Sequence, residues 1–499
     1  MIDDPGLPQL SQAFAGPEVF RARRGDEYQL LPARFIRLDS SRYVLTNLVG
    51  EYVILERDEL AAFVNHGLCK DSAIYQQLKV RHFLIESDST VAIDLLALKY
   101  RTKQSLLPQL TSLFIFVITL RCDHSCPYCQ VSRRSSNREK YDMKFETAQK
   151  AVDIMFQSPS LNIKVEFQGG EPFLCFERIR QIVELVNERN KLERRNIAFV
   201  VASTLAFLDE EILDYCARHH VSLSTSLDGP ESIHNANRPR PDGDSYQRAI
   251  AGIRWARSRL GTQHVNALMT TTPRSLGHAR DIVDEYVKQG FDSIFLRPLS
   301  PFGFAVKTGL VDQVTMSDWV GFYREALEYV LSMNLHGTGF REEYSALLVR
   351  RILTPFPTGY VDLQSPAGVG IAALVFNYDG AIYASDESRM LAETGDATFR
   401  LGHVDHDSYV SIIGSDKLIE MLRQSFTEST PMCSDCGFLP YCGSDPVYHH
   451  ATQGDLVGLK PVSGFCQRNM AILREIFTLL ADDPEKSRVL QRWAFEAAL

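Results

Sequence analysis

The sequence predicts an α/β protein whose central part is a mostly parallel sheet covered by helices. Between residues 113 and 298, strand-like apolar runs alternate with helical patterns six times, which is typical of parallel sheets. A shorter unit of strand-like runs and helical stretches precedes this region, and a cysteine-rich segment follows it. The 499-residue chain is long enough for two or three domains, and its 45% of hydrophobic residues can supply their cores.

The N-terminal unit, residues 18 to about 100, is expected to be a small α+β domain. Its order of elements resembles the winged-helix modules that recognise precursor peptides, in which a peptide adds to a sheet edge. The alternative is a capping domain without a ligand. Residues 91–110 would connect this unit to the central sheet, with the basic run 99–103 facing solvent. The strand-like runs are 28–38, 43–47 and 51–55, and the helical stretches are 58–65 and 72–83.

The central region predicts six strands, each followed by a helix. Apolar residues at helical spacing, such as those in the segment that starts near Ser245, indicate helices with one face on the sheet. The pattern alone leaves open whether the sheet is flat or closes toward a barrel. Residues 317–353 are expected to be helical, with an apolar face in the core. The strand-like runs are 113–120, 163–167, 197–203, 221–226, 264–271 and 293–297.

The loop after the first of these strands carries three cysteines at the spacing Cys-x3-Cys-x2-Cys, namely Cys122, Cys126 and Cys129. Such a loop can hold three irons of a cubane cluster and leave the fourth iron without a protein ligand. An open iron is typical of a reactive cluster, much as catalytic zinc sites keep a position free. The alternatives are three buried thiols or half of a zinc site.

Composition argues against several other classes of protein. With 53 basic and 62 acidic side chains the net charge is −9, which is unfavourable for broad nucleic-acid binding. No secretory signal is visible at residues 1–10, and no apolar run approaches the roughly 20 residues that span a bilayer. We therefore expect a cytoplasmic protein whose ten cysteines are metal ligands rather than disulfides. Cys69, Cys175 and Cys216 lie outside the two cysteine groups and are expected to be packing residues.

At the cysteine loop the sequence resembles the radical S-adenosylmethionine (SAM) superfamily. The resemblance implies a [4Fe-4S] cluster whose open iron binds SAM, and a reduced cluster that cleaves SAM to a 5′-deoxyadenosyl radical. It also implies a partial (β/α)6 barrel with the active site at the carboxyl ends of the strands. Tyr128 resembles the family's aromatic residue beside the cluster and the adenine.

Further motifs imply where SAM would bind. The run Gly169-Gly170-Glu171-Pro172 follows the second strand, and in the family this loop holds the amino group of SAM. Ser226 resembles the ribose-binding position, and Arg238 would pair with the SAM carboxylate, because a guanidinium fork suits carboxylates. The alternative for Arg238 is a surface salt bridge. The third strand ends in Ala-Ser-Thr at 202–204, which departs from the family pattern and makes a SAM contact there an open question.

The C-terminal region carries a second group of thiols, Cys433, Cys436, Cys442 and Cys466, after a predicted hairpin at 368–385. This region resembles the SPASM domain of radical SAM enzymes that act on peptides and proteins, which carries two auxiliary clusters. Ser365, Ser385 and Pro446 stand where three ligands of one auxiliary cluster belong, and such groups replace soft thiolates poorly. We therefore expect one auxiliary [4Fe-4S] cluster, fully ligated by the four thiols, with zinc as the alternative.

Together these features predict an oxidoreductase-type radical SAM maturase that modifies, and in particular crosslinks, a ribosomally made peptide or small protein. The whole chain most resembles maturases of the His-Xaa-Ser repeat peptide system. Expected partners are the peptide, a reductant such as flavodoxin or ferredoxin, and a second radical SAM maturase. The alternatives are an enzyme acting on a small molecule, a sulfatase-type oxidase of one residue, and a non-catalytic iron–sulfur protein. The expected domains are 1–105 (recognition and linker), 106–300 (barrel), 301–364 (helical linker) and 365–499 (auxiliary cluster).

Overall fold

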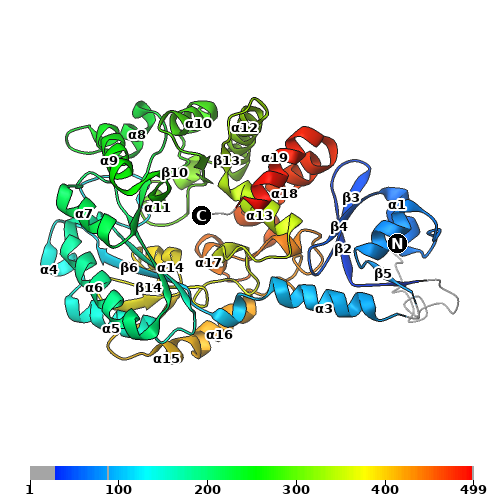
Figure 1. The fold of residues 1–499 in the computed structure, drawn as a ribbon, viewed down its shortest axis with the longest axis horizontal. Coiled ribbons are helices and arrows are strands. Elements are labelled where there is room, and N and C mark those ends of the chain that lie inside the picture. Colours follow the sequence, from blue (N-terminus) through cyan, green and yellow to red (C-terminus); the bar gives the residue numbers. More distant parts are fainter. Residues whose placement is uncertain (1–27, 87–88, 497–499) are drawn as a thin grey trace, which may run out of the picture.

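The computed structural model describes residues 28–86 and 89–496, and its centre is a nine-stranded sheet (Figure 1). The strand order is β12-β10-β9-β8-β7-β6-β14-β15-β16, and every pair from β12 to β14 is parallel. The first seven strands in this order are β12 (Leu296–Arg297), β10 (Val265–Thr270), β9 (Val221–Ser226), β8 (Asn196–Ala202), β7 (Asn162–Gly169), β6 (Leu113–Thr119) and β14 (Ala373–Phe376). The last two are β15 (Ala381–Tyr383) and β16 (Arg400–His403).

The six predicted strand positions are confirmed, with one correction at the last. The run 293–297 is two short strands rather than one, because the chain changes partner at Phe295. β11 (Ser293–Ile294) pairs with β13 (Arg341–Glu342), whereas β12 pairs with β10.

Helices cover the outer face of the parallel strands (Figure 1). Their apolar stripes supply one large core, as the periodicity predicts; α9, for example, buries Ala249, Ile253 and Ala256. The helices between these strands are α4 (Arg138–Tyr141), α5 (Phe145–Met155), α6 (Phe176–Glu193), α7 (Glu210–Arg218), α8 (Glu231–Asn237), α9 (Ser245–Leu260) and α10 (Ala279–Lys288).

The segment predicted to be helical after the barrel-like region is two helices. After the short α11 (Phe304–Lys307), α12 (Met316–Leu335) ends before Gly337, and α13 (Glu343–Leu353) starts directly after β13. The apolar face of α12, which includes Trp319 and Tyr323, is buried in the core as predicted.

The C-terminal hairpin of β14 and β15 is confirmed, but it belongs to the central sheet. β14 pairs in parallel with β6, and Phe376 packs on Phe114 and Phe116 with ring centroids 6.0 and 5.1 Å apart. The cysteine-rich region is therefore joined directly to the central sheet through the pairing of β14 with β6. Its helices are α14 (Asp386–Ala392), α15 (Tyr409–Ile413), α16 (Asp416–Gln424), α17 (Pro446–Gln453), α18 (Gly464–Asp482) and α19 (Pro484–Phe495).

The N-terminal unit contains an antiparallel three-stranded sheet, two helices and its own core. The prediction of one strand over 28–38 was wrong, because this run forms β1 (Gln29–Leu30), which pairs with β5 (Leu84–Ile85), and then β2 (Ala33–Arg37), which pairs with β3 (Arg42–Asn47). The segment expected to be a simple connector is instead the helix α3 (Val91–Lys103), and its basic run is not simply solvated. Lys99 pairs with Glu51, and Lys103 Nζ points inward to the Val49 carbonyl at 3.4 Å. The other elements are β1 (Gln29–Leu30), β2 (Ala33–Arg37), β3 (Arg42–Asn47), β4 (Tyr52–Glu56), α1 (Arg57–Val64), α2 (Ala73–Val80) and β5 (Leu84–Ile85).

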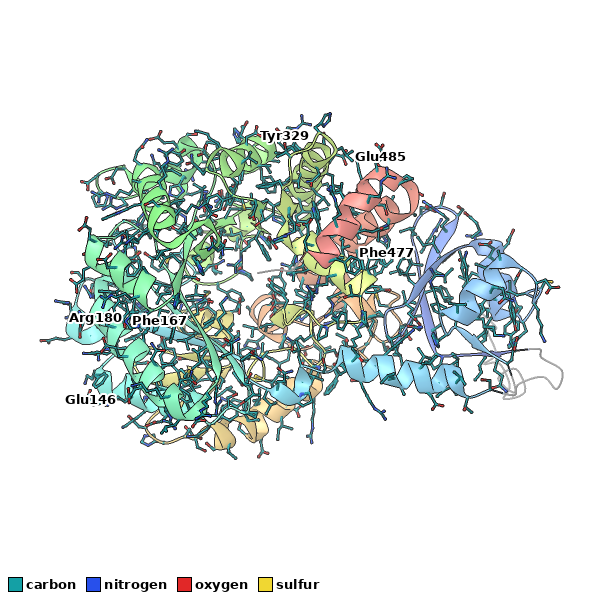
Figure 2. All side chains as sticks on the ribbon, in the orientation of Figure 1. Glu146, Phe167, Arg180, Tyr329, Phe477 and Glu485 are labelled. Carbon is teal, nitrogen blue, oxygen red and sulfur yellow. The ribbon has the colours of Figure 1, made fainter. Side chains whose placement is uncertain are left out.

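The N-terminal sheet rests on the loop that carries the second cysteine group. Thr46 Oγ1 donates to the Gly437 carbonyl at 2.7 Å, and Tyr441 OH donates to the Gly50 carbonyl at 2.9 Å. Phe477 of α18, labelled in Figure 2, fills this junction by stacking on Phe438 with ring centroids 5.4 Å apart. The N-terminal unit and the cysteine-rich loop are thus packed together.

The structure bears only in part on the predictions about a secretory signal and a membrane-spanning segment. Residues 1–10, which carry the signal-peptide prediction, lie outside the described residues. In the described part of the chain, no helix combines the length and the apolar character that a membrane-spanning segment needs.

We expect Gly437→Ala to loosen the contact between the N-terminal sheet and the cysteine-rich loop. A Cβ at this position would lie 2.8 Å from the backbone nitrogen of Ile36, and backbone cannot move aside cheaply. Amide hydrogen exchange in β2 and β3 should therefore become faster in this variant. Gly321→Ala is the matched control, because nothing lies within 4 Å of its added Cβ and alanine favours the surrounding helix. Equal exchange in both variants would contradict the packing described here.

Candidate active site

A cavity with about 1100 Å³ of empty space opens at the carboxyl ends of the parallel strands. It brings together the three cysteines of the first loop and most of the residues that the resemblance assigns to SAM. The predicted residues that line it are Cys122, Cys126, Cys129, Tyr128, Gly169, Gly170, Ser226 and Arg238. Residues from the ends of six strands converge here, as expected for a partial barrel.

The three thiols lie at the cavity wall with no disulfide among them. Burial raises the pKa of Cys126 to about 12 and that of Cys122 well above its usual value. A thiolate here therefore needs a positive partner that the protein alone does not supply. An iron–sulfur cluster would supply it, so the donor set fits the cluster that the sequence predicts.

A polar network holds the cysteine loop in place. His124 is buried, and its two ring nitrogens lie 2.8 Å from Asp123 and 2.8 Å from the Ser245 hydroxyl. Asp123 also accepts from Arg240 at 2.8 Å. Cys122, Asp123 and His124 offer three possible metal-ligand atoms within 4.8 Å, but the bonds just described account for the two polar side chains. We assign them to positioning the loop.

The two glycines after β7 are required by the cysteine loop itself. A Cβ on Gly169 would lie 2.1 Å from the Thr119 carbonyl oxygen, and one on Gly170 would lie 2.2 Å from the Arg121 carbonyl oxygen. Gly169 also has φ of +151°, which disfavours other residues. The sequence indicated close approach to a ligand; the structure shows close approach to the backbone that carries Cys122.

Glu171 does not line the cavity, unlike the two glycines of its motif. Its carboxylate is fully buried and accepts from Phe173 N, from the Ser203 hydroxyl at 2.7 Å, and from both N and Oγ1 of Thr204. The carboxylate therefore joins the end of β7 to the end of β8. The unusual Ser203 and Thr204, which the sequence left open, are its partners, and Thr204 itself lines the cavity.

Arg238 is held by a buried ion pair rather than the surface salt bridge considered as its alternative. Its Nε lies 3.2 Å from Oδ1 of Asp228, which is fully buried, and its guanidinium lies 5.4 Å from the centroid of the Tyr128 ring. Tyr128 OH donates to the other oxygen of Asp228 at 2.5 Å. Asp228 thus fixes two cavity residues at once, and raises the pKa of Arg238 despite its burial.

The sequence-based prediction did not include four titratable groups that line the cavity, namely His124, Glu166, Arg297 and Asp386. The most perturbed of these is Asp386. It begins α14, lines the cavity together with Met390, and has a buried Oδ1 without a hydrogen-bond partner in the described residues. Burial, with smaller contributions from Glu387 and Glu166, raises the pKa of Asp386 to about 7. No local signal marks this residue, because only the pairing of β14 with β6 brings α14 to the strand ends.

The second group of cysteines also comes together in space. Burial and the neighbouring thiols Cys442, Cys433 and Cys436 raise the pKa of Cys466 to about 12. Backbone and side-chain N–H groups point at two of the sulfurs: Phe438 N lies 3.4 Å from Cys436 Sγ, and Asn469 Nδ2 lies 3.4 Å from Cys442 Sγ. In the described residues no three of these sulfurs lie within 4.8 Å of one another. Sulfurs on one zinc ion would be closer, at roughly 3.8 Å.

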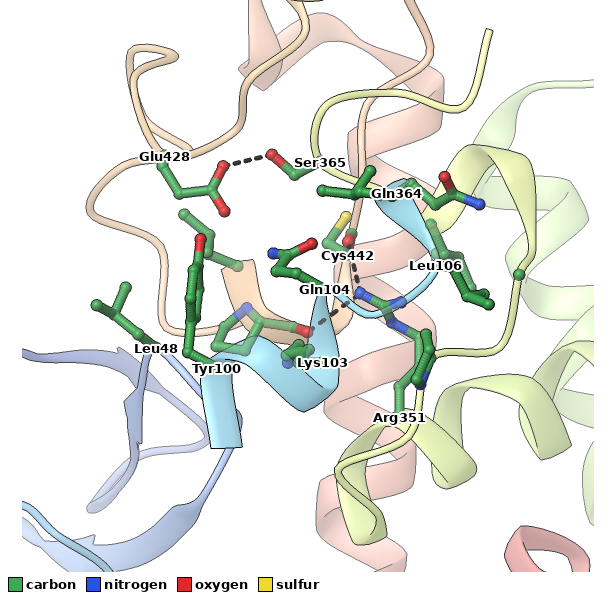
Figure 3. Close-up of a pocket in the computed structure, with 16 residues that line it drawn as sticks. Leu48, Tyr100, Lys103, Gln104, Leu106, Arg351, Gln364, Ser365, Glu428 and Cys442 are labelled. Atoms are coloured by element: carbon green, nitrogen blue, oxygen red, sulfur yellow. Dashed lines mark hydrogen bonds between the residues drawn. The ribbon is translucent and has the colours of Figure 1, made fainter. Parts of the chain in front are cut away.

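Buried cations surround these thiols without carboxylate partners. Figure 3 shows Lys103 and Arg351 at a cavity beside Cys442, where Arg351 donates to the carbonyls of residues 440–442 at 3.0 to 3.3 Å. Burial lowers the pKa of Lys103 well below its usual value and that of Arg351 to about 10. Among the described side chains neither forms an ion pair within 4.0 Å. An anionic tetrathiolate metal centre would satisfy both charges, so the donor set fits one.

The positions where the sequence lacks further thiols hold groups that are already engaged. Ser365 donates to Glu428 (Figure 3), the Ser385 hydroxyl caps the start of α14, and Pro446 is the first residue of α17. Of the cysteines expected to be packing residues, Cys216 is buried and Cys175 half-buried, whereas Cys69 is exposed, so the prediction was wrong for Cys69.

Comparison with known proteins is consistent with this arrangement. Residues 116–294 match the family model of the radical SAM superfamily. An uncharacterised protein of Methanocaldococcus jannaschii is 31% identical over 129 residues, which are 26% of this chain and 42% of that protein. The chain thus spans less than half the length of this relative. A cysteine-type anaerobic sulfatase-maturating enzyme of Clostridium perfringens is 22% identical over 337 residues, which are 66% of this chain and 87% of that enzyme.

Two solved structures share the fold. That of anSMEcpe with bound AdoMet has a TM-score of 0.63 at 18% identity, and covers 76% of this chain and 98% of its own. That of Streptococcus suis SuiB bound to its precursor peptide SuiA has a TM-score of 0.51 at 13% identity, and covers 89% and 99%. Together with the family match and the cavity, these similarities lead to one conclusion: residues 116–294 of this chain form a radical SAM domain.

Proposed function

We propose that this protein is a radical SAM maturase that oxidatively modifies, and in particular crosslinks, a ribosomally synthesised peptide or small protein. The observation that carries the proposal is the cavity at the strand ends, which combines the three thiols of Cys122, Cys126 and Cys129 with Gly169, Gly170 and Ser226. The peptide as substrate is supported by the fold that this chain shares, over 89% of its length, with SuiB, which has been solved with a precursor peptide. The His-Xaa-Ser repeat type remains our finer proposal, carried by the sequence resemblance.

When bound, the reduced cluster and SAM supply the 5′-deoxyadenosyl radical that removes a hydrogen atom from the substrate. The chain's own residues orient the partners and exclude water. Tyr128 and Arg238, fixed by Asp228, form one wall, and Ser226 offers a hydroxyl to the ribose of SAM. Glu171 stabilises the SAM-binding loop by bonding Ser203 and Thr204, so we assign it a positioning role rather than the ammonium contact expected from the sequence.

Asp386 is our proposed proton acceptor. A carboxylate with a pKa of about 7 is well matched to accept a proton near neutral pH. Its place at the cavity, opposite the cysteine loop on the other side of β6, gives it access to a substrate bound there.

The four thiols of Cys433, Cys436, Cys442 and Cys466 would hold one auxiliary [4Fe-4S] cluster. Lys103 and Arg351, which form no ion pair among the described side chains, support an anionic thiolate-bound metal centre, and the sequence resemblance favours iron–sulfur over zinc. Since all four ligands come from the protein, its role would be electron transfer and support of the surrounding loop.

A second candidate is oxidation of a single Cys or Ser of a target protein, which the similarity to the sulfatase-maturating enzyme favours. Both candidates predict SAM cleavage by the reduced protein. Mass spectrometry of a co-expressed candidate peptide separates them, because a crosslink joins two residues whereas the sulfatase-type reaction changes one.

Iron and sulfide content of the reconstituted protein tests the cluster assignment. We expect roughly eight irons in the native chain and about four in the Cys122→Ala/Cys126→Ala/Cys129→Ala variant, for two [4Fe-4S] clusters. About twelve irons would mean that further ligands hold a third cluster. About four irons falling to none, with zinc retained, would make the C-terminal site a zinc site.

Substitution of Arg238 tests its separate roles in stability and SAM binding. Arg238→Met leaves Asp228 charged and buried, which should cost about 3–5 kcal/mol of unfolding free energy. The double variant Asp228→Asn/Arg238→Met should recover most of that loss, measured by denaturant unfolding, but should still bind SAM more weakly in equilibrium dialysis. Native SAM affinity in the double variant would show that Arg238 is structural only.

Asp386→Asn should abolish peptide modification but not SAM cleavage. With the substrate found by co-expression, product formation should fall by about 10²–10⁴-fold, the range for a lost general base. In the native enzyme, product formation should rise with pH through about 7, because Asp386 accepts a proton only when ionised. Deoxyadenosine formation reports SAM cleavage in both proteins, and Asp312→Asn, an exposed acid, is the control. An unchanged pH profile in Asp386→Asn would exclude Asp386 as the base.

A further inference from the structure

A second cavity, with about 670 Å³ of empty space, lies beside the first and shares Arg297 with it. It is formed by the loop after β12 and by residues of α13, α14, α17 and α18. The polar side chains in its wall are Arg297, Asp362, Glu387, Asp445 and Arg468, and the rings are Phe295, Trp319, Tyr344, Tyr360, Tyr448 and Phe465.

The wall of this cavity includes residues close to the positions where the SPASM pattern has cysteines and this chain has none. Glu387 and Asp445 lie within two residues of Ser385 and Pro446, where the SPASM pattern has thiols. Carboxylates and guanidiniums therefore stand in the wall of this cavity, and one of them, Arg297, also lines the cavity at the strand ends.

Several charged groups in the wall have no partner within the protein. Among the described residues, Asp362, Glu387 and Arg297 form no side-chain hydrogen bond or ion pair within 4.0 Å, and Nε of Arg468 is buried without a hydrogen-bond partner. Asp445 caps the start of α17, where its Oδ1 accepts a hydrogen bond from Tyr448 N at 2.8 Å. Asp362, Glu387 and Arg297 are only half-buried and border the open cavity, so a ligand of matching charge can pair with them there in place of water.

The charged side chains in the cavity wall indicate that the ligand should be a cation. When all five groups are ionised, three carboxylates face two guanidiniums, which leaves one negative charge uncompensated, and a bound cation would favour this ionised form. Burial, and after it Glu387, raises the pKa of Asp362 to about 6; burial, and after it Asp362, raises the pKa of Asp445 well above its usual value. The carboxylates thus repel one another, and a cation among them would be attracted by all three.

The rings favour the same kind of ligand. Tyr344 and Tyr360 lie with centroids 6.0 Å apart, and Arg468 already lies 5.5 Å from the Tyr344 ring and 5.1 Å from the Phe465 ring. Aromatic walls with carboxylates at their edges suit the apolar stem and charged head of a long basic side chain.

We infer that this second cavity binds a lysine or arginine side chain of the peptide substrate, next to the residue that is modified in the first cavity. The inference deepens the proposed function and rests on it. Because Arg297 borders both cavities, neighbouring residues of one extended peptide can reach the two at once.

Binding of short peptides tests this inference without knowledge of the natural substrate. Fluorescein-labelled Gly-Gly-Xaa-Gly-Gly, with Xaa lysine, norleucine or glutamate, is titrated with the reconstituted, SAM-loaded protein and followed by fluorescence anisotropy. The lysine peptide should bind about tenfold more tightly than the norleucine peptide, and the glutamate peptide most weakly. Equal affinity for lysine and norleucine, or preference for glutamate, would overturn the inference.

Variants locate the binding. Glu387→Gln/Asp445→Asn should remove the preference for lysine, and Asn at 445 can still accept the bond that starts α17. Glu387→Gln alone removes no side-chain hydrogen bond or ion pair among the described residues, and it should reduce the preference for lysine by a smaller factor than the double variant does. The control Glu146→Gln removes an exposed acid of α5, which does not line this cavity, and should keep the preference (Figure 2). A preference that survives in Glu387→Gln/Asp445→Asn would place the binding elsewhere.

Deoxyadenosine formation by the dithionite-reduced protein is measured on the same preparations. Its absence would contradict the proposed radical SAM function, whereas loss of lysine preference alone would contradict only the second cavity's role. The two failures are therefore distinguishable.

Discussion

Parallel pairing of β6 on both of its edges is the constraint on which the site depends. β6 lies between β7 and β14, and its residues 114–119 are buried. The cysteine loop leaves its carboxyl end, where Arg121 and the Thr119 hydroxyl both bond Asp142 at 2.6 to 2.8 Å. Because parallel strands end at the same edge, pairing on one side brings Gly169 and Gly170 against the cysteine loop, and pairing on the other side brings Asp386 to the same opening.

Buried charge divides the C-terminal region into two parts of opposite sign. Lys103 and Arg351 lie on one side of the loop that begins at Cys442, and Asp445, three residues later, lies with Asp362 and Glu387 on the other. Buried charges are stable only beside a counter-charge. The cationic part suits a thiolate-bound cluster, and the anionic part suits a basic substrate group. A short turn of chain thus separates the proposed auxiliary cluster from the proposed substrate subsite.

Packing on the cysteine-rich loop brings the N-terminal unit, which we predict to recognise a peptide, to this region. Thr46 and Gly50 bond the backbone at Gly437 and the Tyr441 hydroxyl, and α3 carries Lys103 from the same unit to the side of Cys442. A peptide added to the N-terminal sheet would therefore lie on a surface that rests on the auxiliary thiols.

Local patterns in the sequence determined the strands, the helices and both cysteine groups. Apolar periodicity reports which face of one element is buried, and thiol spacing reports what one loop can ligate, so both act over a few residues. The prediction was therefore correct for the six strand positions, for the apolar face of α12 and for the hairpin at β14 and β15. It was wrong where 91–103 was taken as a simple connector, because Lys99 and Lys103 find partners in the N-terminal unit.

Only the tertiary structure decided what the polar residues do. Glu171 bonds Ser203 and Thr204 across 32 and 33 residues, Asp228 holds Tyr128 across 100, and Asp386 reaches the cavity through strand pairing with β6. Each of these partners is brought close by the sheet and not by the chain's own order. A buried carboxylate must find its donors wherever the fold places them, so its role depends on contacts that no local pattern encodes.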